Sequence, residues 1–270
     1  MVEKMTTLCK KLFGWIHKET KPFIRFYSLD SGTVTLFPIV KSAAVDRNFL
    51  LNSQIGDLAE TLTSKNCPGI KKIVSSGWIV PAPADFSIHT NGDGIRFEWS
   101  EPYRFSKITP GMDAYINSHT RSQTEPLLDD EHTTLKTVVK VETPWRIEAS
   151  DDTVLLIVPV TYNNENRFSA AIGILDPKYG HVVNIQLFWK VLNGETIVKA
   201  GTPLCQIIPI SRKALSRSYY NVIIDTATDR DTAKEREFNY ASNCAFLAND
   251  SLSSRLSRVI TVLNKYKTKE

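Results

Sequence analysis

The segment Gly173-Ile174-Leu175-Asp176-Pro177-Lys178-Tyr179-Gly180 places a carboxylate and an aromatic ring three positions apart on one turn. Pro177 fixes one backbone angle, and the two glycines permit tight bends. Such a turn can hold Asp176 and Tyr179 toward one pocket. In the alternative interpretation, Asp176 caps its own turn and Tyr179 fills the end of a barrel.

The longer run from Gly173 to Ile210 resembles the core hairpin of the dUTPase and dCTP deaminase fold. After the turn, the likeness continues through a strand and the spacing of Lys199, Gly201, Leu204, Gln206 and Ile207. This resemblance implies a nucleotide ligand. It makes Asp176 the candidate catalytic residue, which would orient water or sugar. The candidate ligand-binding residues that it implies are Tyr179, Gln206, Gly173 and Gly180. The same residues also fit a plain meander in which glycine and aspartate serve only the turns.

Three features of the dUTPase and deaminase families are missing. The phosphate-binding Ser-Gly of dUTPases would follow Pro159, where the sequence reads Val160-Thr161-Tyr162-Asn163-Asn164. The glycine-rich C-terminal arm is absent, because the pattern of the tail is helical. The strand after Gly180 offers Asn184 and Gln186 where the deaminase needs a glutamate, and an amide cannot accept and return protons. The sequence therefore supports neither chemistry and does not establish an enzyme.

The wider layout resembles an uncharacterised family of tailed-phage proteins from marine T4-like phages. The likeness spans most of residues 20 to 215 and implies a phage or viral origin, with a cytoplasmic location in the host. The segments that carry it are Cys67-Pro68-Gly69-Ile70, Gly77-Trp78-Ile79-Val80-Pro81 to Asp85, Thr143-Pro144-Trp145-Arg146, and Gly201 to Ile210.

Composition excludes several classes of partner. The net charge of +4, from 33 basic and 29 acidic residues, does not predict nucleic-acid binding. No run approaches the roughly 20 apolar residues of a membrane span, so no membrane partner is expected. The four cysteines are far apart, which favours reduced thiols in the cytoplasm over a zinc site or disulfide framework.

Metal ligands follow no recognisable spacing, and no metal site is predicted. Four histidines, at positions 89, 119, 132 and 181, have no acidic residue two positions on. The only cofactor considered is magnesium, held by carboxylates such as Asp85, Asp113 or Asp176 in an active nucleotide hydrolase.

The expected fold is mainly β, a dUTPase-like β-sandwich or barrel with peripheral and C-terminal α-helices. We predict an N-terminal amphipathic segment over residues 1–19, a β-barrel or sandwich domain over 20–212, and a C-terminal helical extension over 213–270. Within the sheet domain, Asn91-Gly92-Asp93-Gly94 predicts a tight β-hairpin.

Other elements follow from local patterns. The β-branched runs 23–27 and 33–40, around Asp30-Ser31-Gly32, predict a second hairpin. Residues 77–89 are expected to be extended, 106–136 to form a long surface excursion, and 136–141 and 153–160 to be strands. Helical spacing marks 55–65, 227–248 and 253–265.

Three functions remain open from the sequence. The first is a nucleotide-binding β-protein that sequesters or processes a nucleotide or a nucleotide-derived signal. The second is a structural or protein-interaction module, such as a virion or host-takeover component, and the third is an active nucleotide hydrolase. A homo-oligomer is expected, a trimer first and a dimer second, because the resembling family builds its sites between subunits.

Overall fold

The computed structural model describes residues 21–47, 67–102, 114–127, 133–246 and 260. Within them the chain is mainly antiparallel β-sheet with few helices, which confirms the mainly β class. The described residues belong to two units, one drawn from 1–41, 77–160 and 165–216 and the other from 42–76, 161–164 and 217–270. None of the described helices is long and apolar enough to cross a membrane.

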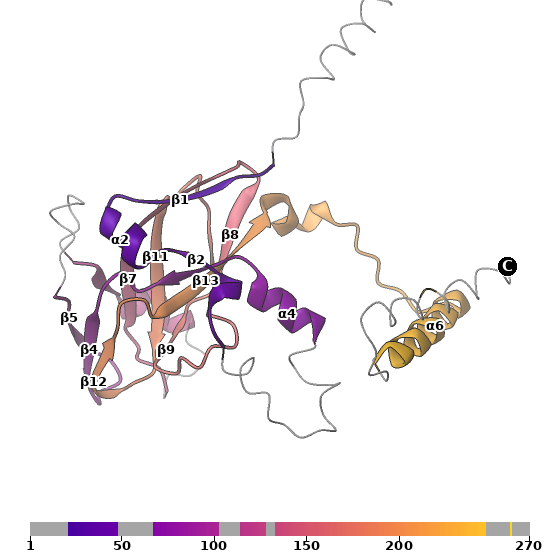
Figure 1. The fold of residues 1–270 in the computed structure, drawn as a ribbon. Helices are drawn as coiled ribbons and strands as arrows, with labels where there is room; N and C mark the ends of the chain where they lie inside the picture. Colours follow the sequence, from indigo (N-terminus) through magenta and orange to yellow (C-terminus); the bar gives the residue numbers. More distant parts are fainter. Residues whose placement is uncertain (1–20, 48–66, 103–113, 128–132, 247–259, 261–270) are drawn as a thin grey trace, which may run out of the picture. The chain divides into compact units, whose positions relative to one another are not determined.

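Three antiparallel sheets make up the first unit (Figure 1). The first sheet has the order β1 (Ile24–Ser28), β7 (Val138–Ala149), β11 (Val182–Trp189) and β9 (Phe168–Ala170), with β6 (Ile116–His119) also on β7. The second has the order β10 (Gly173–Leu175), β8 (Thr153–Val158), β13 (Pro203–Ser211), β3 (Trp78–Pro81) and β2 (Val40–Lys41). The third has the order β12 (Asn193–Val198), β4 (Phe86–Asn91) and β5 (Phe97–Ser100).

The helices are short, apart from the last. The α-helices are α2 (Ser31–Leu36), α4 (Pro68–Ser75), α5 (Arg121–Thr124) and α6 (Asp229–Phe246). The 3-10 turns are η1 (Ser42–Ala44), η3 (Glu125–Leu127), η4 (Arg212–Leu215) and η5 (Arg217–Tyr219). Pro68 occupies the first position of α4, where its missing N–H costs nothing.

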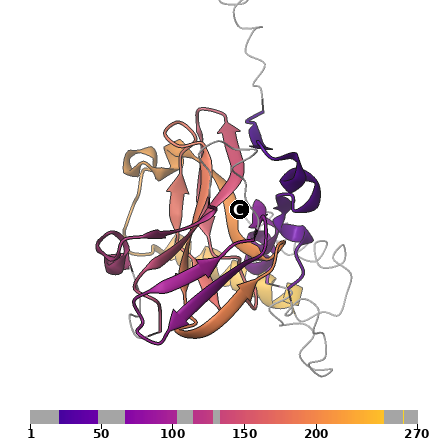
Figure 2. The same cartoon turned by 90° about the vertical axis from the view of Figure 1, so that its left-hand side faces the viewer.

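One hydrophobic core joins the three sheets, whose strands Figure 2 shows from a second side. Strand β11 shows why, because Val183, Ile185, Leu187 and Trp189 are fully buried on alternate positions. Period-2 alternation sends one set of side chains into the core and leaves the other face available. On that other face lie Val182, Asn184 and Gln186, only half-buried.

Several sequence predictions are confirmed. Strands β3 and β4 occupy the extended segment 77–89, and β4 pairs with β5 across the Asn91–Gly94 turn. Strand β8 matches the run predicted over 153–160, and α6 matches the helix predicted over 227–248. Strand β7 begins in the run predicted over 136–141 but continues to Ala149. The amphipathic segment 1–19 and the helix 55–65 lie outside the described residues, as does 253–265 except for Ile260.

The predicted hairpin around Asp30-Ser31-Gly32 is wrong. Strand β1 pairs with β7, and Ser31–Leu36 is the helix α2. The Asp30 carboxylate accepts hydrogen bonds from the N–H groups of Gly32 (3.1 Å) and Thr33 (3.0 Å), so it caps the helix. An Asp before a Ser-Gly pair suits both a turn and an N-cap, and the local β-propensity of Val34 and Thr35 was overridden.

The predicted surface excursion over 106–136 is also wrong in part. Tyr115, Ile116 and Leu135 are fully buried, and β6 pairs with β7. The buried Glu101 carboxylate accepts hydrogen bonds from the N–H groups of Tyr115 and Ile116, each at 2.9 Å. A carboxylate distant in sequence therefore anchors a strand that the local pattern does not mark.

Residues 173–210 do not form a hairpin or a meander. Their four strands pair with strands outside the segment: β10 with β8, β11 with β7 and β9, β12 with β4, and β13 with β3 and β8. Pairing between distant segments is set by the shared core, which turn residues do not reveal.

The second unit contains a buried cation with neutral partners. Arg47 is 1% exposed and donates to the carbonyl oxygens of Ser42 (2.9 Å), Val45 (3.0 Å) and Thr161 (2.8 Å). The Ser42 hydroxyl donates to the carbonyl of Val74 at 2.8 Å. Arg47 and Ser42 thus tie together residues 42–47, α4 and the 161–164 segment.

Gly77 is predicted to be essential to the fold. It has φ +67°, and a Cβ there would lie 1.9 Å from the carbonyl oxygen of Ile207. We expect Gly77→Ala to lower the free energy of unfolding by about 3 kcal/mol or more, measured by urea denaturation. Gly94 is the control, because its φ is +68° but nothing lies within 4 Å of an added Cβ. Gly94→Ala should cost only about 1 kcal/mol, and equal losses in the two variants would contradict the steric argument.

Candidate functional site

Strands β10 and β11 separate on either side of a loop at residues 176–181. Pairing with β9 ends near Ala171, whose N–H donates to the Gln186 carbonyl at 2.8 Å. The next strand, β10, pairs with β8 in another sheet. Among the described strands, β10 and β11 do not pair with each other. A groove of about 550 Å³ lies between them, lined by both strands, the loop and Ile157 of β8. We call it the β10–β11 groove.

Three of the predicted ligand-binding residues, Gly173, Tyr179 and Gly180, line this groove. Tyr179 is 87% exposed, so its ring does not fill a barrel end as the alternative interpretation required. Gly173 has no atom within 4 Å of a built Cβ, which leaves this wall of the groove open. The structure therefore brings together the glycine and aromatic part of the predicted site.

Asp176, the candidate catalytic residue, serves the loop and does not line the groove. Arg212 of η4 binds its carboxylate through both terminal nitrogens, one at 2.7 Å, and the Lys178 N–H donates to it at 3.0 Å. The N–H groups of Tyr179 and Gly180 both donate to the Asp176 carbonyl at 3.0 Å. Arg212 holds the pKa of the Asp176 carboxyl below its usual value, so the carboxylate stays charged and its ion pair with Arg212 holds the loop in place.

Gln206, the fourth predicted ligand-binding residue, does not line the groove. It lies fully buried on β13, between β8 and β3. A residue with no exposed surface cannot touch a ligand in an open groove. The motif that suggested Gln206 therefore marks a structural position in this chain.

Three polar residues of the groove were not proposed as ligand-binding from the sequence: His181, Asn184 and Gln186. The Asn184 Oδ1 is buried without a hydrogen-bond partner in the described part of the chain. The Gln186 Nε2 lies 3.5 Å from the His119 Nε2 of β6. Asn184 and Gln186 are two positions apart and therefore lie on the same face of β11, which the sequence could have indicated. The sequence does not show which face of the strand remains uncovered.

The rest of the groove is apolar. Ile172 and Ile174 are 72% and 45% exposed at its rim, and Ile157 and Leu175 complete its walls. Apolar walls with a few convergent polar groups are typical of small-molecule sites, and the volume falls in their usual range.

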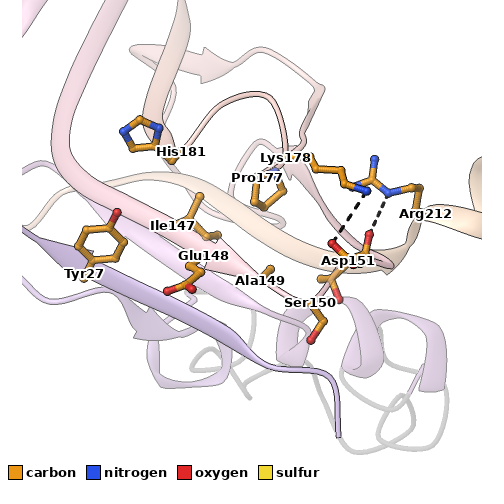
Figure 3. Close-up of a pocket in the computed structure, with 11 residues that line it drawn as sticks. Tyr27, Ile147, Glu148, Ala149, Ser150, Asp151, Pro177, Lys178, His181 and Arg212 are labelled. Atoms are coloured by element: carbon orange, nitrogen blue, oxygen red, sulfur yellow. Dashed lines mark hydrogen bonds and ion pairs between the residues drawn. The ribbon is translucent and has the colours of Figure 1, made fainter. Parts of the chain in front are cut away.

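A second hollow of about 350 Å³ lies on the other side of the loop (Figure 3). It is lined by Pro177, Lys178 and His181 of the loop and by charged and polar residues of neighbouring elements. These are Tyr27, Glu148, Ser150, Asp151, Thr153 and Arg212, with Ile147 and Ala149. We call it the Lys178 hollow. His181 lines both the hollow and the groove, so the two sites adjoin at this residue.

The carboxylates considered for magnesium do not form a cluster in the described residues. Asp85 accepts hydrogen bonds from the Lys199 amine and the Ala200 N–H, each at 2.8 Å, while Asp176 is bound to Arg212. Asp113 lies outside the described residues. A search of the described part of the chain finds no group of three or more His, Cys, Asp or Glu side chains that could hold a metal ion.

Comparison with known proteins assigns no family. No protein-family model matches the sequence, and no curated protein matches it at a significant level. The function must therefore be argued from the groove and the hollow.

The Asp176–Arg212 pair should stabilise the fold in a pH-dependent way. Both side chains are largely covered, 18% and 32% exposed, so we expect Asp176→Asn to lower Tm by about 2–4 °C at pH 7. Because the folded-state pKa of Asp176 is depressed, this stabilisation is present above the ordinary carboxyl pKa of about 4 and is lost as pH falls through the lower value. Thermal melts from pH 3 to 8 measure the difference.

The exposed Asp225→Asn serves as the matched control and should leave Tm unchanged at every pH. A Tm difference between wild type and Asp176→Asn that persists at full size at pH 3 would show that the pair is not its source.

Proposed function

We propose that this chain is a nucleotide-binding β-protein whose β10–β11 groove receives the nucleoside part of the ligand. The support is the position of the groove, which coincides with the turn where the sequence resembles the dUTPase and dCTP deaminase fold. On the phage-like layout alone, we also propose a viral origin.

The unpartnered Asn184 oxygen carries this proposal. Three buried side-chain atoms lack a hydrogen-bond partner in the described residues: Trp145 Nε1, Trp189 Nε1 and Asn184 Oδ1. Of these three residues, Asn184 alone lines the groove. A buried acceptor without a donor costs roughly 1–3 kcal/mol, which a ligand N–H would recover. The amino and imino N–H groups of a nucleobase are donors of this kind, and the Gln186 amide beside Asn184 offers both a donor and an acceptor.

Tyr179 supplies a surface for a planar ring. Its side chain is almost fully exposed at the edge of the groove, where an unliganded aromatic ring has little contact with the protein. Stacking of a base on an exposed aromatic ring contributes about 1–3 kcal/mol. The aliphatic rim of Ile172 and Ile174 would cover the remaining apolar face of the ligand.

The groove supports binding and storage of a nucleotide rather than turnover. Among its described lining residues there is no carboxylate, and His181 is the only histidine. The nearest acid of the loop, Asp176, is bound to Arg212. The proposed activity is therefore sequestration of a nucleotide or a nucleotide-derived signal.

Calorimetric titration with a panel of ribo- and deoxynucleosides and their 5′-phosphates tests this proposal. We expect at least one base to bind wild-type protein. Tyr179→Ala should weaken binding by about tenfold or more through lost stacking, and Asn184→Leu by a similar factor through the lost acceptor. Neither exposed Tyr179 nor unpaired Asn184 should be needed for stability, so Tm should stay within about 2 °C of wild type.

Phe238→Ala is the matched control, because Phe238 is also an exposed aromatic residue (66%) but lines neither the groove nor the hollow. It should bind as wild type does. If no member of the panel binds wild type, or if Tyr179→Ala and Asn184→Leu bind normally, the groove is not a nucleotide site.

A second candidate function, a protein-interaction module, has support from another segment. Residues 219–224 of the second unit include Tyr219, Tyr220, Val222, Ile223 and Ile224, which are 55% to 94% exposed. Five large apolar side chains within six positions exceed what a monomer usually leaves in water. We assign this segment to contact with a second copy of the chain, in keeping with the expected homo-oligomer.

Light scattering tests that assignment. Wild-type protein should have the mass of a trimer or dimer, and the Val222→Asp/Ile224→Asp variant should be mainly monomeric, because burying a carboxylate in an apolar contact is costly. A wild type that is monomeric at all concentrations would contradict it.

A further inference from the structure

We propose that the Lys178 hollow receives a single phosphate group, so that the ligand is a nucleoside monophosphate. This inference rests on the proposed function of the β10–β11 groove and names the class of ligand that the groove and hollow would bind together.

The loop brings the two sites within reach of one small ligand. Lys178 lines the hollow and its neighbour Tyr179 lines the groove, and the Cα atoms of consecutive residues are only about 3.8 Å apart. His181 lines both sites. The pKa of Arg212 is raised, mainly by Asp176 and to a smaller extent by Tyr179. The Tyr179 side chain, which lines the groove, is therefore close enough to interact electrostatically with Arg212, which lines the hollow.

Three donors that line the hollow have at most a loose side-chain partner. The Lys178 amine lies 3.9 Å from the Asp151 carboxylate, a loose and exposed pair. Within the described residues, the His181 ring and the Tyr27 hydroxyl make no hydrogen bond. Figure 3 shows Tyr27 and His181 across the hollow from Lys178 and Arg212. The Lys178 amine is the donor that we assign to the phosphate, because a charge-assisted hydrogen bond is the strongest contact that the hollow offers.

Arg212 acts as a positioning residue in this arrangement. Its terminal nitrogens are bound to Asp176, and its Nε donates to the Asp151 carbonyl at 3.0 Å. These contacts fix the loop that carries Lys178 and Tyr179, so Arg212 has little capacity left for a ligand.

Charge in the hollow limits how many phosphates fit. Its lining contains two cations, Lys178 and Arg212, and two carboxylates, Glu148 and Asp151. Glu148 is paired with Arg25 at 3.3 Å, and Arg212 is neutralised by Asp176. Lys178 has only the loose contact of 3.9 Å with Asp151, so it is the one cation of the hollow that a phosphate could draw away, and one cation suits one phosphate. The further phosphates of a triphosphate would meet the carboxylates without compensating cations.

The test uses calorimetry on the full chain with the base that binds best in the panel above, as the deoxynucleoside, its 5′-monophosphate and its 5′-triphosphate. Inorganic phosphate alone is a fourth probe. We expect the monophosphate to bind wild type about tenfold more tightly than the nucleoside, the gain of one charge-assisted contact. The triphosphate should bind no more than about threefold more tightly than the monophosphate.

Lys178→Ala should abolish the gain from the phosphate while leaving the affinity for the nucleoside unchanged, because its N–H bond to Asp176 is retained. Lys190→Ala, an exposed lysine outside both sites, should keep the full gain. The inference alone fails if the nucleoside binds as tightly as the monophosphate, if Lys178→Ala keeps the gain, or if the triphosphate binds tenfold more tightly. If no nucleoside or nucleotide binds, the proposed function fails and this inference fails with it; binding of inorganic phosphate alone would leave the hollow as a general anion site.

Discussion

The separation of β10 from β11 into different sheets is the constraint on which the candidate site depends. The two strands are consecutive in the chain, yet each is committed to other partners, β10 to β8 and β11 to β7 and β9. Their facing edges cannot close on each other, so a groove remains between them. The loop that spans the gap has little packing of its own and is held by the ion pair between Asp176 and Arg212, which connects it to the end of β13.

This arrangement explains why the acidic residue of the turn and its aromatic residue have different roles. A carboxylate beside an arginine is held as an ion and used for structure, whereas the ring three positions later stays exposed. The polar groups that remain in the groove are His181, Tyr179 and a pair of amides on β11, between apolar walls. The amides offer the donors and acceptors that the proposed recognition of a base requires.

The sequence predicts the local parts of this fold well. The Asn91–Gly94 turn specifies its hairpin because the residues that set the geometry are adjacent. Asp30 misleads because an Asp-Ser-Gly run suits a turn and a helix cap equally, and the strand 116–119 escapes notice because its anchor, Glu101, is remote. In the candidate site, too, local patterns are predictable and contacts between distant segments are not. Tyr179, Gly173 and Gly180 lie where the turn pattern suggests, while Gln206 is buried by strands that pair over long distances. The unpaired oxygen of Asn184 is a property of the assembled structure, which no spacing of residues encodes.

Amide chemical-shift mapping by nuclear magnetic resonance tests the central claim most directly, that a nucleoside binds between β10 and β11. On addition of the deoxynucleoside that binds best, the account predicts the largest shifts at residues 172–175 and 179–186, with little change at the Asn91–Gly94 turn. Shifts concentrated in other strands, or no shifts for any nucleoside at saturating concentration, would contradict it.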